Sequence, residues 1–297
     1  MRILLLGKNG QLGWELQRSL APLGELVALD RQGADGLCGD LADLQGLTAT
    51  VRQLQPQLIV NAAAYTAVDQ AEREPELARR INAEAPAGLA REAAASGALL
   101  VHYSTDYVFD GSGSTPWQED DATGPLSVYG ATKLEGEQAI VQSGCKHLIL
   151  RTSWVYAARG GNFARTMLRL GQERERLTVI DDQWGAPTGA ELIADVTAHA
   201  IVQTRAQPAK AGTYHLAPAG ETSWFGYASH VIAQARQVLP AGRIKATEIA
   251  PIPSSDYPTP ARRPHNSRLD TRRLQATFGL RLPPWPQGVE RMLAEIL

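Results

Sequence analysis

The chain has 297 residues, of which 44% are hydrophobic and 20% charged, so it suits one large domain or a large and a small one. Its net charge of −2 provides no general attraction to nucleic acid or to an anionic membrane surface, and we expect neither as a partner. Two cysteines, Cys38 and Cys145, exclude a disulfide framework and a cysteine-rich zinc site.

The apolar segments favour a cytoplasmic location. Only four apolar residues, 3–6, precede Gly7-Lys8, which is too few for a signal peptide. No apolar run approaches the roughly 20 residues that cross a membrane as a helix. We therefore expect a soluble cytoplasmic protein.

The first half of the sequence alternates short apolar runs with amphipathic stretches. Runs of strand length lie at 2–6, 26–29, 58–61, 99–104 and 147–151. Helical spacing of apolar residues is found at 11–20, 41–54, 75–95 and 128–143. Because strands that are covered on both faces are apolar throughout, this alternation predicts a parallel sheet between two helical layers. The predicted fold is a doubly wound, Rossmann-like α/β fold.

The pattern loosens after about residue 155. Helices are predicted at 162–172, 189–204 and 223–239, with a short one at 287–297. Residues 250–264 hold five prolines and are predicted to be extended or looped. We expect a larger sheet domain, mainly residues 1–155, and a smaller C-terminal lobe, mainly residues 156–297, with the two lobes interleaved.

A glycine-rich turn connects the first predicted strand to the first predicted helix. It reads GKNGQLG and follows the GxxGxxG pattern. Glycine lets the backbone approach a pyrophosphate, and the helix N-terminus offers N–H groups and a favourable dipole to its charge. The turn predicts that the first domain binds NAD(P). The expected cofactor contacts are Gly7, Gly10, Gln11, Leu12 and Gly13.

Further cofactor contacts are expected where later strands end. Asp30 ends the second strand and favours NAD through the adenine ribose, whereas the adjacent Arg31 favours the 2′-phosphate of NADP, so the choice stays open. Asp40-Leu41 follows a third strand region and is placed at the adenine. The small residues Ala62, Ala63 and Ala64 follow the fourth strand and allow a flat ligand to lie against the backbone.

A tyrosine and a lysine four residues apart begin the helix predicted at 128–143. The spacing puts Tyr129 and Lys133 on one helix face. A lysine cation beside a phenol lowers the pKa of the tyrosine, which then exchanges a proton with a substrate oxygen near neutral pH. Thr105 ends the fifth strand, at the edge where ligands bind, and is positioned to hydrogen-bond the reacting carbonyl oxygen. His102 is expected in the core, since no histidine pair has zinc-ligand spacing.

Five segments in this order resemble the extended short-chain dehydrogenase/reductases, and among them the dTDP-4-dehydrorhamnose reductase family: GKNGQLG, NAAAYTAVD, STDYVFDG, YGATK and RTSWVY. The resemblance continues through residues 182–189 and 263–267, so it covers nearly the whole chain. It implies NADPH or NADH as the cofactor and a dTDP-sugar as the substrate, with the smaller lobe as the substrate-binding lobe. The implied reaction is reduction of the C4 ketone of dTDP-4-dehydro-β-L-rhamnose to dTDP-L-rhamnose.

The resemblance also implies roles for single residues. Thr105, Tyr129 and Lys133 form the catalytic triad, with Tyr129 as the proton donor. Tyr65 and Thr66 join the cofactor contacts. The implied substrate-binding residues are Thr105, Asp106, Tyr107, Trp154 and Arg263, with Arg263 on the pyrophosphate. Trp154 as a core aromatic and Arg263 as a surface charge are the alternative interpretations.

A homodimer and bound magnesium are further implications of the resemblance. The matching glutamates are Glu15, Glu191 and Glu295. The sequence alone describes them equally well as three solvated helix carboxylates, and both interpretations stay open.

The alternatives to this reaction are reduction of a different deoxyhexose nucleotide and three other functions. A 4,6-dehydratase typically has Asp-Glu after the threonine, whereas this chain has Asp106-Tyr107, which disfavours dehydration. A 4-epimerase uses the same tyrosine and lysine, and the resemblance of the C-terminal lobe argues against it. A non-catalytic, dinucleotide-binding regulatory subunit would not need the complete triad.

Overall fold

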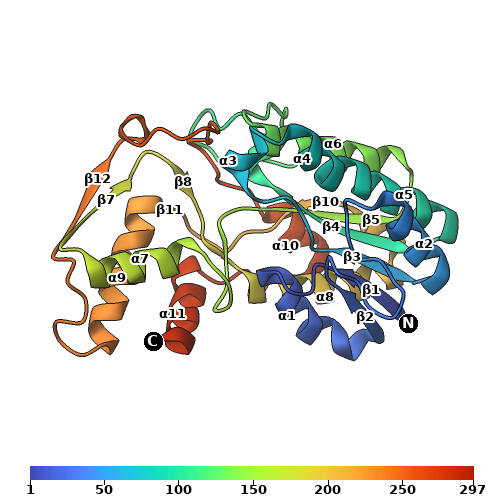
Figure 1. The fold of residues 1–297 in the computed structure, drawn as a ribbon, viewed down its shortest axis with the longest axis horizontal. Coiled ribbons are helices and arrows are strands. Elements are labelled where there is room, and N and C mark those ends of the chain that lie inside the picture. The colour runs from blue at the N-terminus through green and yellow to red at the C-terminus, as the bar shows by residue number, and fades with distance from the viewer.

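Six parallel strands form the central sheet in the computed structural model, which describes residues 1–297 (Figure 1). They lie in the order β10-β5-β4-β3-β1-β2, and every neighbouring pair is parallel. This arrangement confirms the predicted doubly wound α/β fold. The strands are β1 (Arg2–Leu6), β2 (Glu25–Leu29), β3 (Leu58–Asn61), β4 (Leu99–Thr105), β5 (His147–Thr152) and β10 (Gly212–His215).

Helices cover both faces of the sheet (Figure 1). Successive side chains of a strand point to opposite faces, so Ile3 and Leu5 of β1 lie in one hydrophobic core and Leu4 and Leu6 in the other. The helices of the first face are α1 (Gln11–Leu20), α8 (Ala190–Ala206) and α10 (Arg272–Phe278). Those of the second face are α2 (Leu44–Leu54), α5 (Ala85–Ser96) and α6 (Val128–Gln142).

A second lobe lies beside the sheet and has its own hydrophobic core (Figure 1). Its strands β7 (Arg176–Ile180) and β12 (Glu248–Ile252) pair in parallel, which gives part of the proline-rich segment a strand conformation. Short pairs join β6 (Val155–Tyr156) to β9 (Thr188–Gly189), and β8 (Trp184–Gly185) to β11 (Thr222–Ser223). Its helices are α7 (Phe163–Glu173), α9 (Trp224–Val238) and α11 (Trp285–Ile296).

Three local predictions differ from the structure. The helix expected over 75–95 is divided into α4 (Pro75–Arg79), a π-helical turn (Arg80–Glu84) and α5, and a short α3 (Val68–Ala71) precedes it. The helix expected from Leu41 begins at Leu44, because the Asp43 side chain accepts a hydrogen bond from the Gly46 amide at 2.9 Å and caps it. No third strand precedes Asp40; residues 34 and 37 form only an isolated bridge.

The two lobes share the chain between them. The sheet takes its last strand, β10, and the covering helix α8 from beyond residue 155. The division of the chain into two domains near residue 155 stays a prediction, because the sheet domain contains elements from both sides of it. Every helix of the structure is too short or too polar to span a bilayer.

Candidate active site

A cavity of about 1060 Å³ opens at the carboxyl edge of the sheet. It lies where the strand order reverses between β1 and β3, the position at which open α/β sheets bind ligands. Of the predicted catalytic, cofactor and substrate residues, all but Gly13 and Arg263 line it. The predicted residues in its wall are Gly7, Gly10, Gln11, Leu12, Asp30, Arg31, Asp40, Leu41, Ala62, Ala63, Ala64, Tyr65, Thr66, Thr105, Asp106, Tyr107, Tyr129, Lys133 and Trp154.

The glycine-rich turn is shaped by two close approaches. Gly7 has a φ of +88°, and a Cβ there would lie 2.8 Å from the Ala63 amide nitrogen. A Cβ on Gly13 would lie 2.0 Å from the Gly7 carbonyl oxygen. Gly13 therefore lets α1 pack directly under the turn, outside the cavity wall.

The carboxylate of Asp30 is already engaged. Asn9 donates to its Oδ2 at 2.7 Å, the Gln32 amide donates to its Oδ1 at 3.0 Å, and Lys8 Nζ lies 3.7 Å from Oδ2. Arg31 lines the cavity next to it. Nearby donors and a lysine thus balance part of the negative charge of the Asp30 carboxylate. The sequence predicts that this carboxylate lies at the adenine ribose.

The loop after β3 is fixed by Asn82, which sequence reasoning missed. Its Oδ1 accepts from the Tyr65 amide at 2.9 Å, and its Nδ2 donates to the Tyr65 carbonyl at 3.1 Å and to Thr132 Oγ1 at 3.3 Å. Asn82 belongs to the π-helical turn, and such turns are frequent at functional sites. It ties the loop of Tyr65 to α6, which carries Tyr129 and Lys133.

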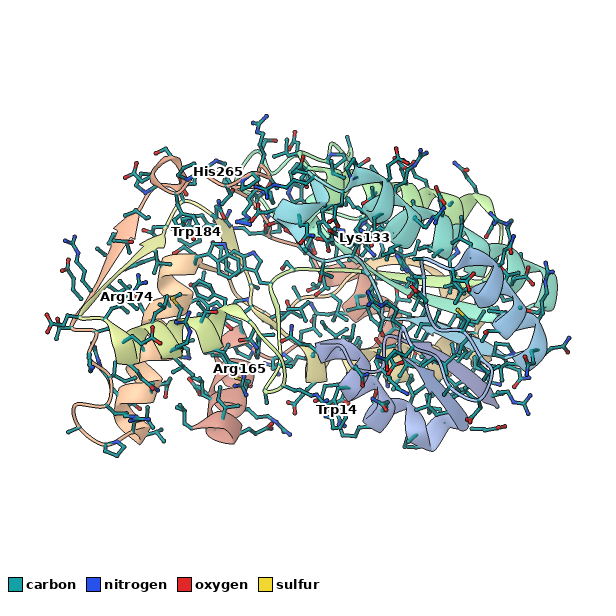
Figure 2. All side chains as sticks on the ribbon, viewed as in Figure 1. Trp14, Lys133, Arg165, Arg174, Trp184 and His265 are labelled. Carbon is teal, nitrogen blue, oxygen red and sulfur yellow. The ribbon has the colours of Figure 1, made fainter.

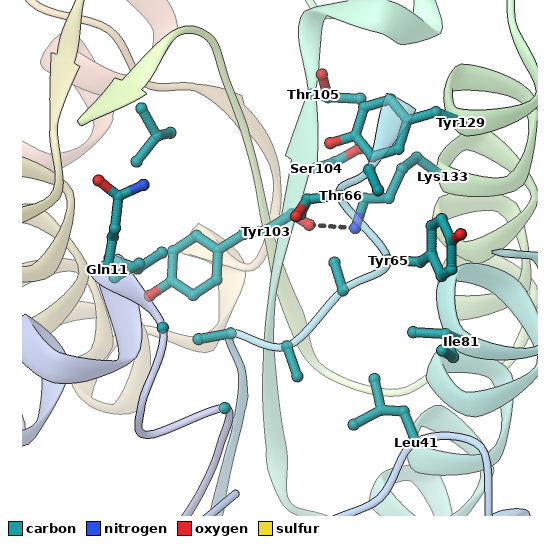
Figure 3. Close-up of a pocket in the computed structure, with 18 of the residues that line it drawn as sticks. Gln11, Leu41, Tyr65, Thr66, Ile81, Tyr103, Ser104, Thr105, Tyr129 and Lys133 are labelled. Atoms are coloured by element: carbon teal, nitrogen blue, oxygen red, sulfur yellow. Dashed lines mark hydrogen bonds between the residues drawn. The ribbon is translucent and has the colours of Figure 1, made fainter. Parts of the chain in front are cut away.

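Tyr129 and Lys133 project from the first turns of α6 into the cavity (Figure 3). The helix begins where Ser127 accepts a hydrogen bond from the Gly130 amide at 3.2 Å. Lys133 is 2% exposed and lies within the α/β domain (Figure 2). Its Nζ donates to the Tyr103 carbonyl at 2.6 Å and lies 3.0 Å from His102 Nε2. His102 is 1% exposed, as predicted for a core residue.

The expectation that Lys133 lowers the pKa of Tyr129 is wrong. Burial raises the pKa of Tyr129 to about 12, and hydrogen bonding by Thr105 opposes that rise. Lys133 does not offset this rise because its Nζ is directed at Tyr103 and His102, and burial lowers its own pKa to about 8. The tyrosine is therefore held as a neutral phenol, the form that donates a proton.

Asp106 places a buried carboxyl beside the triad. Its Oδ1 accepts from Thr105 Oγ1 at 3.1 Å, and its Oδ2 has no partner. Burial raises its pKa to about 6, and the nearby hydroxyls of Ser267 and Thr105 oppose that rise. The ring of Tyr107 packs edge-on against Tyr129, with centroids 5.5 Å apart. The free Asp106 oxygen can bind a hydroxyl donor in the cavity.

Two tryptophans form an aromatic wall. Trp154 has a φ of +49°, a strained value for a residue with a side chain, and it stacks on Trp224 with centroids 3.7 Å apart. Trp224, from the start of α9, also lines the cavity. It was not predicted, because no local pattern links it to residues 70 positions earlier. This wall brings the second lobe to the site.

Arg263 lies outside the cavity wall. Its guanidinium binds Asp69 at 2.8 Å, and its charge lowers the pKa of the nearby Tyr107, against a larger rise caused by burial. The pyrophosphate role of Arg263 stays a prediction.

The three glutamates that the resemblance implies as magnesium ligands lie around one cavity, and their magnesium role stays a prediction. Glu15, Glu191 and Glu295 line a separate cavity of about 250 Å³, but no three acidic, histidine or cysteine side chains are close enough to hold an ion. Arg291 pairs with two of them: its Nε lies 3.0 Å from Glu191 and 3.8 Å from Glu295. The homodimer stays a prediction.

Comparison with known proteins identifies the family. The model of the RmlD substrate binding domain matches residues 1–297. A dTDP-4-dehydrorhamnose reductase from Salmonella typhimurium is 57% identical, with 100% of this chain and 98% of the relative covered. The reductase of that name from Clostridium acetobutylicum has a similar structure, with a TM-score of 0.90, 34% identity, and 100% and 99% of the two chains covered.

A Bacillus anthracis reductase of the same name, solved in complex with NADP, gives a TM-score of 0.87 at 34% identity, with 99% of each chain covered. Family model, full-length identity and structure agree. The chain therefore belongs to the RmlD substrate binding domain family, whose members most similar in sequence here are named dTDP-4-dehydrorhamnose reductase.

Proposed function

We propose that this protein is an NAD(P)H-dependent reductase that converts dTDP-4-dehydro-β-L-rhamnose to dTDP-L-rhamnose. The observation that carries the proposal is one cavity with two parts. The glycine-rich turn lies on one side of it, and Thr105, Tyr129 and Lys133 lie on the other (Figure 3). The Salmonella typhimurium relative, 57% identical over nearly its whole length, supports the substrate.

The residues present fit a dinucleotide. The turn at Gly7 leaves no room for a side chain, which suits close approach of a diphosphate to the N-terminus of α1. When bound, a reduced nicotinamide supplies the hydride. At the other end, Lys8 and Asn9 engage the Asp30 carboxylate and Arg31 offers a cation for a 2′-phosphate, which supports use of both NADH and NADPH.

The side chains of the triad provide proton transfer and charge stabilisation. Tyr129 holds a proton at its phenol oxygen and donates it to the C4 oxygen as negative charge develops there. Thr105 turns its hydroxyl away from Asp106 Oδ1 to donate a hydrogen bond to the same oxygen. We assign Lys133 to the hydroxyls of the nicotinamide ribose, since its Nζ is directed at Tyr103 and His102 and not at Tyr129. Asp106, Tyr107 and Trp154 surround the space proposed for the sugar.

A coupled assay tests the proposal. dTDP-glucose is converted in situ by a 4,6-dehydratase and a 3,5-epimerase, then offered with NADH or NADPH to the wild type, to Tyr129→Phe and to Tyr214→Phe. Tyr214 is the matched control, because its hydroxyl bonds the Lys210 carbonyl outside the cavity. We expect dTDP-L-rhamnose from the wild type and the control, and a loss of kcat of about 10²–10⁴-fold in Tyr129→Phe with NADPH binding retained.

Two results would contradict the proposal in different ways. Near-normal turnover by Tyr129→Phe would show that another group donates the proton. If the folded wild type oxidises neither cofactor, the reductase assignment itself is wrong.

A further inference from the structure

A chain of hydrogen-bonding groups runs beneath the cavity from the backbone of Ala63 to Lys133. The Ala63 amide donates to Asn61 Oδ1 at 3.2 Å, and Asn61 Nδ2 lies 3.2 Å from His102 Nδ1. His102 Nε2 lies 3.0 Å from Lys133 Nζ. The three side chains are 1–2% exposed, so each must find its partners inside the protein.

The Ala63 amide fixes the direction of these hydrogen bonds, because it can only donate. A backbone N–H only donates, so Asn61 Oδ1 faces Ala63 and Asn61 Nδ2 donates to His102 Nδ1. The neutral ring then carries its proton on Nε2, which faces Lys133. Burial keeps the ring neutral, since it lowers the pKa of His102 well below its usual value. The Nε2–H of His102 is matched when Lys133 Nζ accepts this hydrogen bond, which requires a neutral amine.

Protonation of Lys133 exchanges the donor and acceptor roles along this series of hydrogen bonds. An ammonium only donates, so His102 Nε2 must accept and the ring proton must move to Nδ1. Nδ1–H then faces the Asn61 amide nitrogen, another donor. The conflict is relieved when the Asn61 amide turns over, which removes its oxygen from the Ala63 N–H. Ala63 lines the cavity in the loop that precedes Tyr65.

We propose that His102 is a positioning residue whose tautomer changes together with the charge of Lys133, and that Asn61 passes this change to the backbone at Ala63. The inference rests on the proposed function only in taking the cavity as the cofactor site. It links the lysine charge to the loop against which the cofactor is proposed to lie.

The other charged groups around α6 are engaged elsewhere. Glu137, one turn after Lys133, favours its charged form, but Arg151 of β5 binds that carboxylate through Nε at 3.0 Å and Nη2 at 2.7 Å. Burial dominates and lowers the pKa of Lys133 to about 8. Around the rest of α6, Glu72 accepts from the Val128 amide, Arg79 of α4 pairs with Glu135, and Asp106 acts on Tyr129.

Nitrogen-15 NMR of the imidazoles tests the coupling without any substrate. We expect His102 of the full chain to carry its proton on Nδ1 well below pH 8 and on Nε2 well above it, with a midpoint near the Lys133 pKa of about 8. The signal lost in His102→Gln assigns the resonance. A single His102 tautomer across this range would overturn the proposal.

The pH dependence of NADPH binding tests the positioning role. A charged Lys133 attracts the anionic cofactor, so the Kd should rise as pH increases through the lysine pKa. A glutamine oxygen accepts from the ammonium without any tautomer change, so His102→Gln should move the midpoint up by about one pH unit, equivalent to tenfold in proton affinity. His102→Leu removes the acceptor and should move the midpoint down.

His215→Gln is the matched control, because His215 is another fully buried histidine of the sheet that does not line the cavity. Its midpoint should equal that of the wild type. Equal midpoints in wild type and His102→Gln would overturn the proposal, and the glutamine variant decides this even if His102→Leu does not fold. If the sugar is reduced but the tautomer is constant, only this inference fails. If NADPH does not bind, the proposed function fails and NMR still decides the inference.

Discussion

Replacing Gly13 with alanine should weaken stability and cofactor binding, although Gly13 lies outside the cavity wall. The new Cβ would lie 2.0 Å from the Gly7 carbonyl oxygen and 2.7 Å from its carbon. Normal non-bonded separations are about 3.5 Å, so α1 must move away from the turn by about 1 Å or more. Overpacking of this kind typically destabilises by about 1–3 kcal/mol, and each kcal/mol lowers Tm by about 2–4 °C in a large domain.

The assay is urea unfolding followed by tryptophan fluorescence, together with an NADPH titration. Gly88→Ala in α5 is the matched control, since its Cβ would meet nothing closer than 3.8 Å and alanine favours a helix by about 1 kcal/mol. Because the shift moves the N–H groups of α1 away from the proposed diphosphate, we expect the NADPH Kd of Gly13→Ala to rise about tenfold, or about 1.4 kcal/mol. Wild-type stability and affinity in Gly13→Ala would refute the packing argument.

Three further predictions concern buried or paired charges. The pKa of Asp106 is raised to about 6, so its contribution to stability is complete below about pH 4 and is lost as the pH rises through 6. Asp106→Asn should therefore reduce the difference in unfolding free energy between pH 5 and pH 8, measured by urea unfolding. An unchanged difference would contradict the prediction. Glu137→Gln leaves the buried Arg151 charge poorly matched and should lower the unfolding free energy by about 3–5 kcal/mol, whereas a loss below about 1 kcal/mol would mean that the pair is dispensable. Arg263→Ala should raise KM for the sugar nucleotide and leave the NADPH Kd unchanged, and an equal KM would remove Arg263 from the substrate site.

The sequence predicted the elements whose signals are local. The apolar run at 2–6 and the helical spacing at 11–20 match β1 and α1 residue for residue. Tyr129 and Lys133 were found because four-residue spacing on one helix fixes their relation before any tertiary contact forms. The glycine turn was found because it lies between the first strand and the first helix.

Features that depend on tertiary contacts were missed. Strand β10 has four residues and begins with glycine, so its apolar signal is too short to detect. The π-helical turn around Asn82 has the composition of an ordinary helix. Its functional contact is the hydrogen bond from the Tyr65 amide to Asn82, 17 positions away, which no local pattern shows. Trp224 reaches Trp154 only through packing of the second lobe. The lysine–tyrosine pKa relation failed because sequence spacing does not show where an ammonium points.

The position of β10 affects how the protein can be divided. Its backbone bonds the outer edge of β5 over residues 212–215, and the covering helix α8 comes from the same late segment. A chain that ends near residue 155 would leave β5 as an unpaired edge and bare the apolar sheet face under α8, both of which promote aggregation. The protein should therefore resist proteolytic dissection into two autonomous folding units, and its first half should reach the native state only after the ribosome has released residues beyond 216.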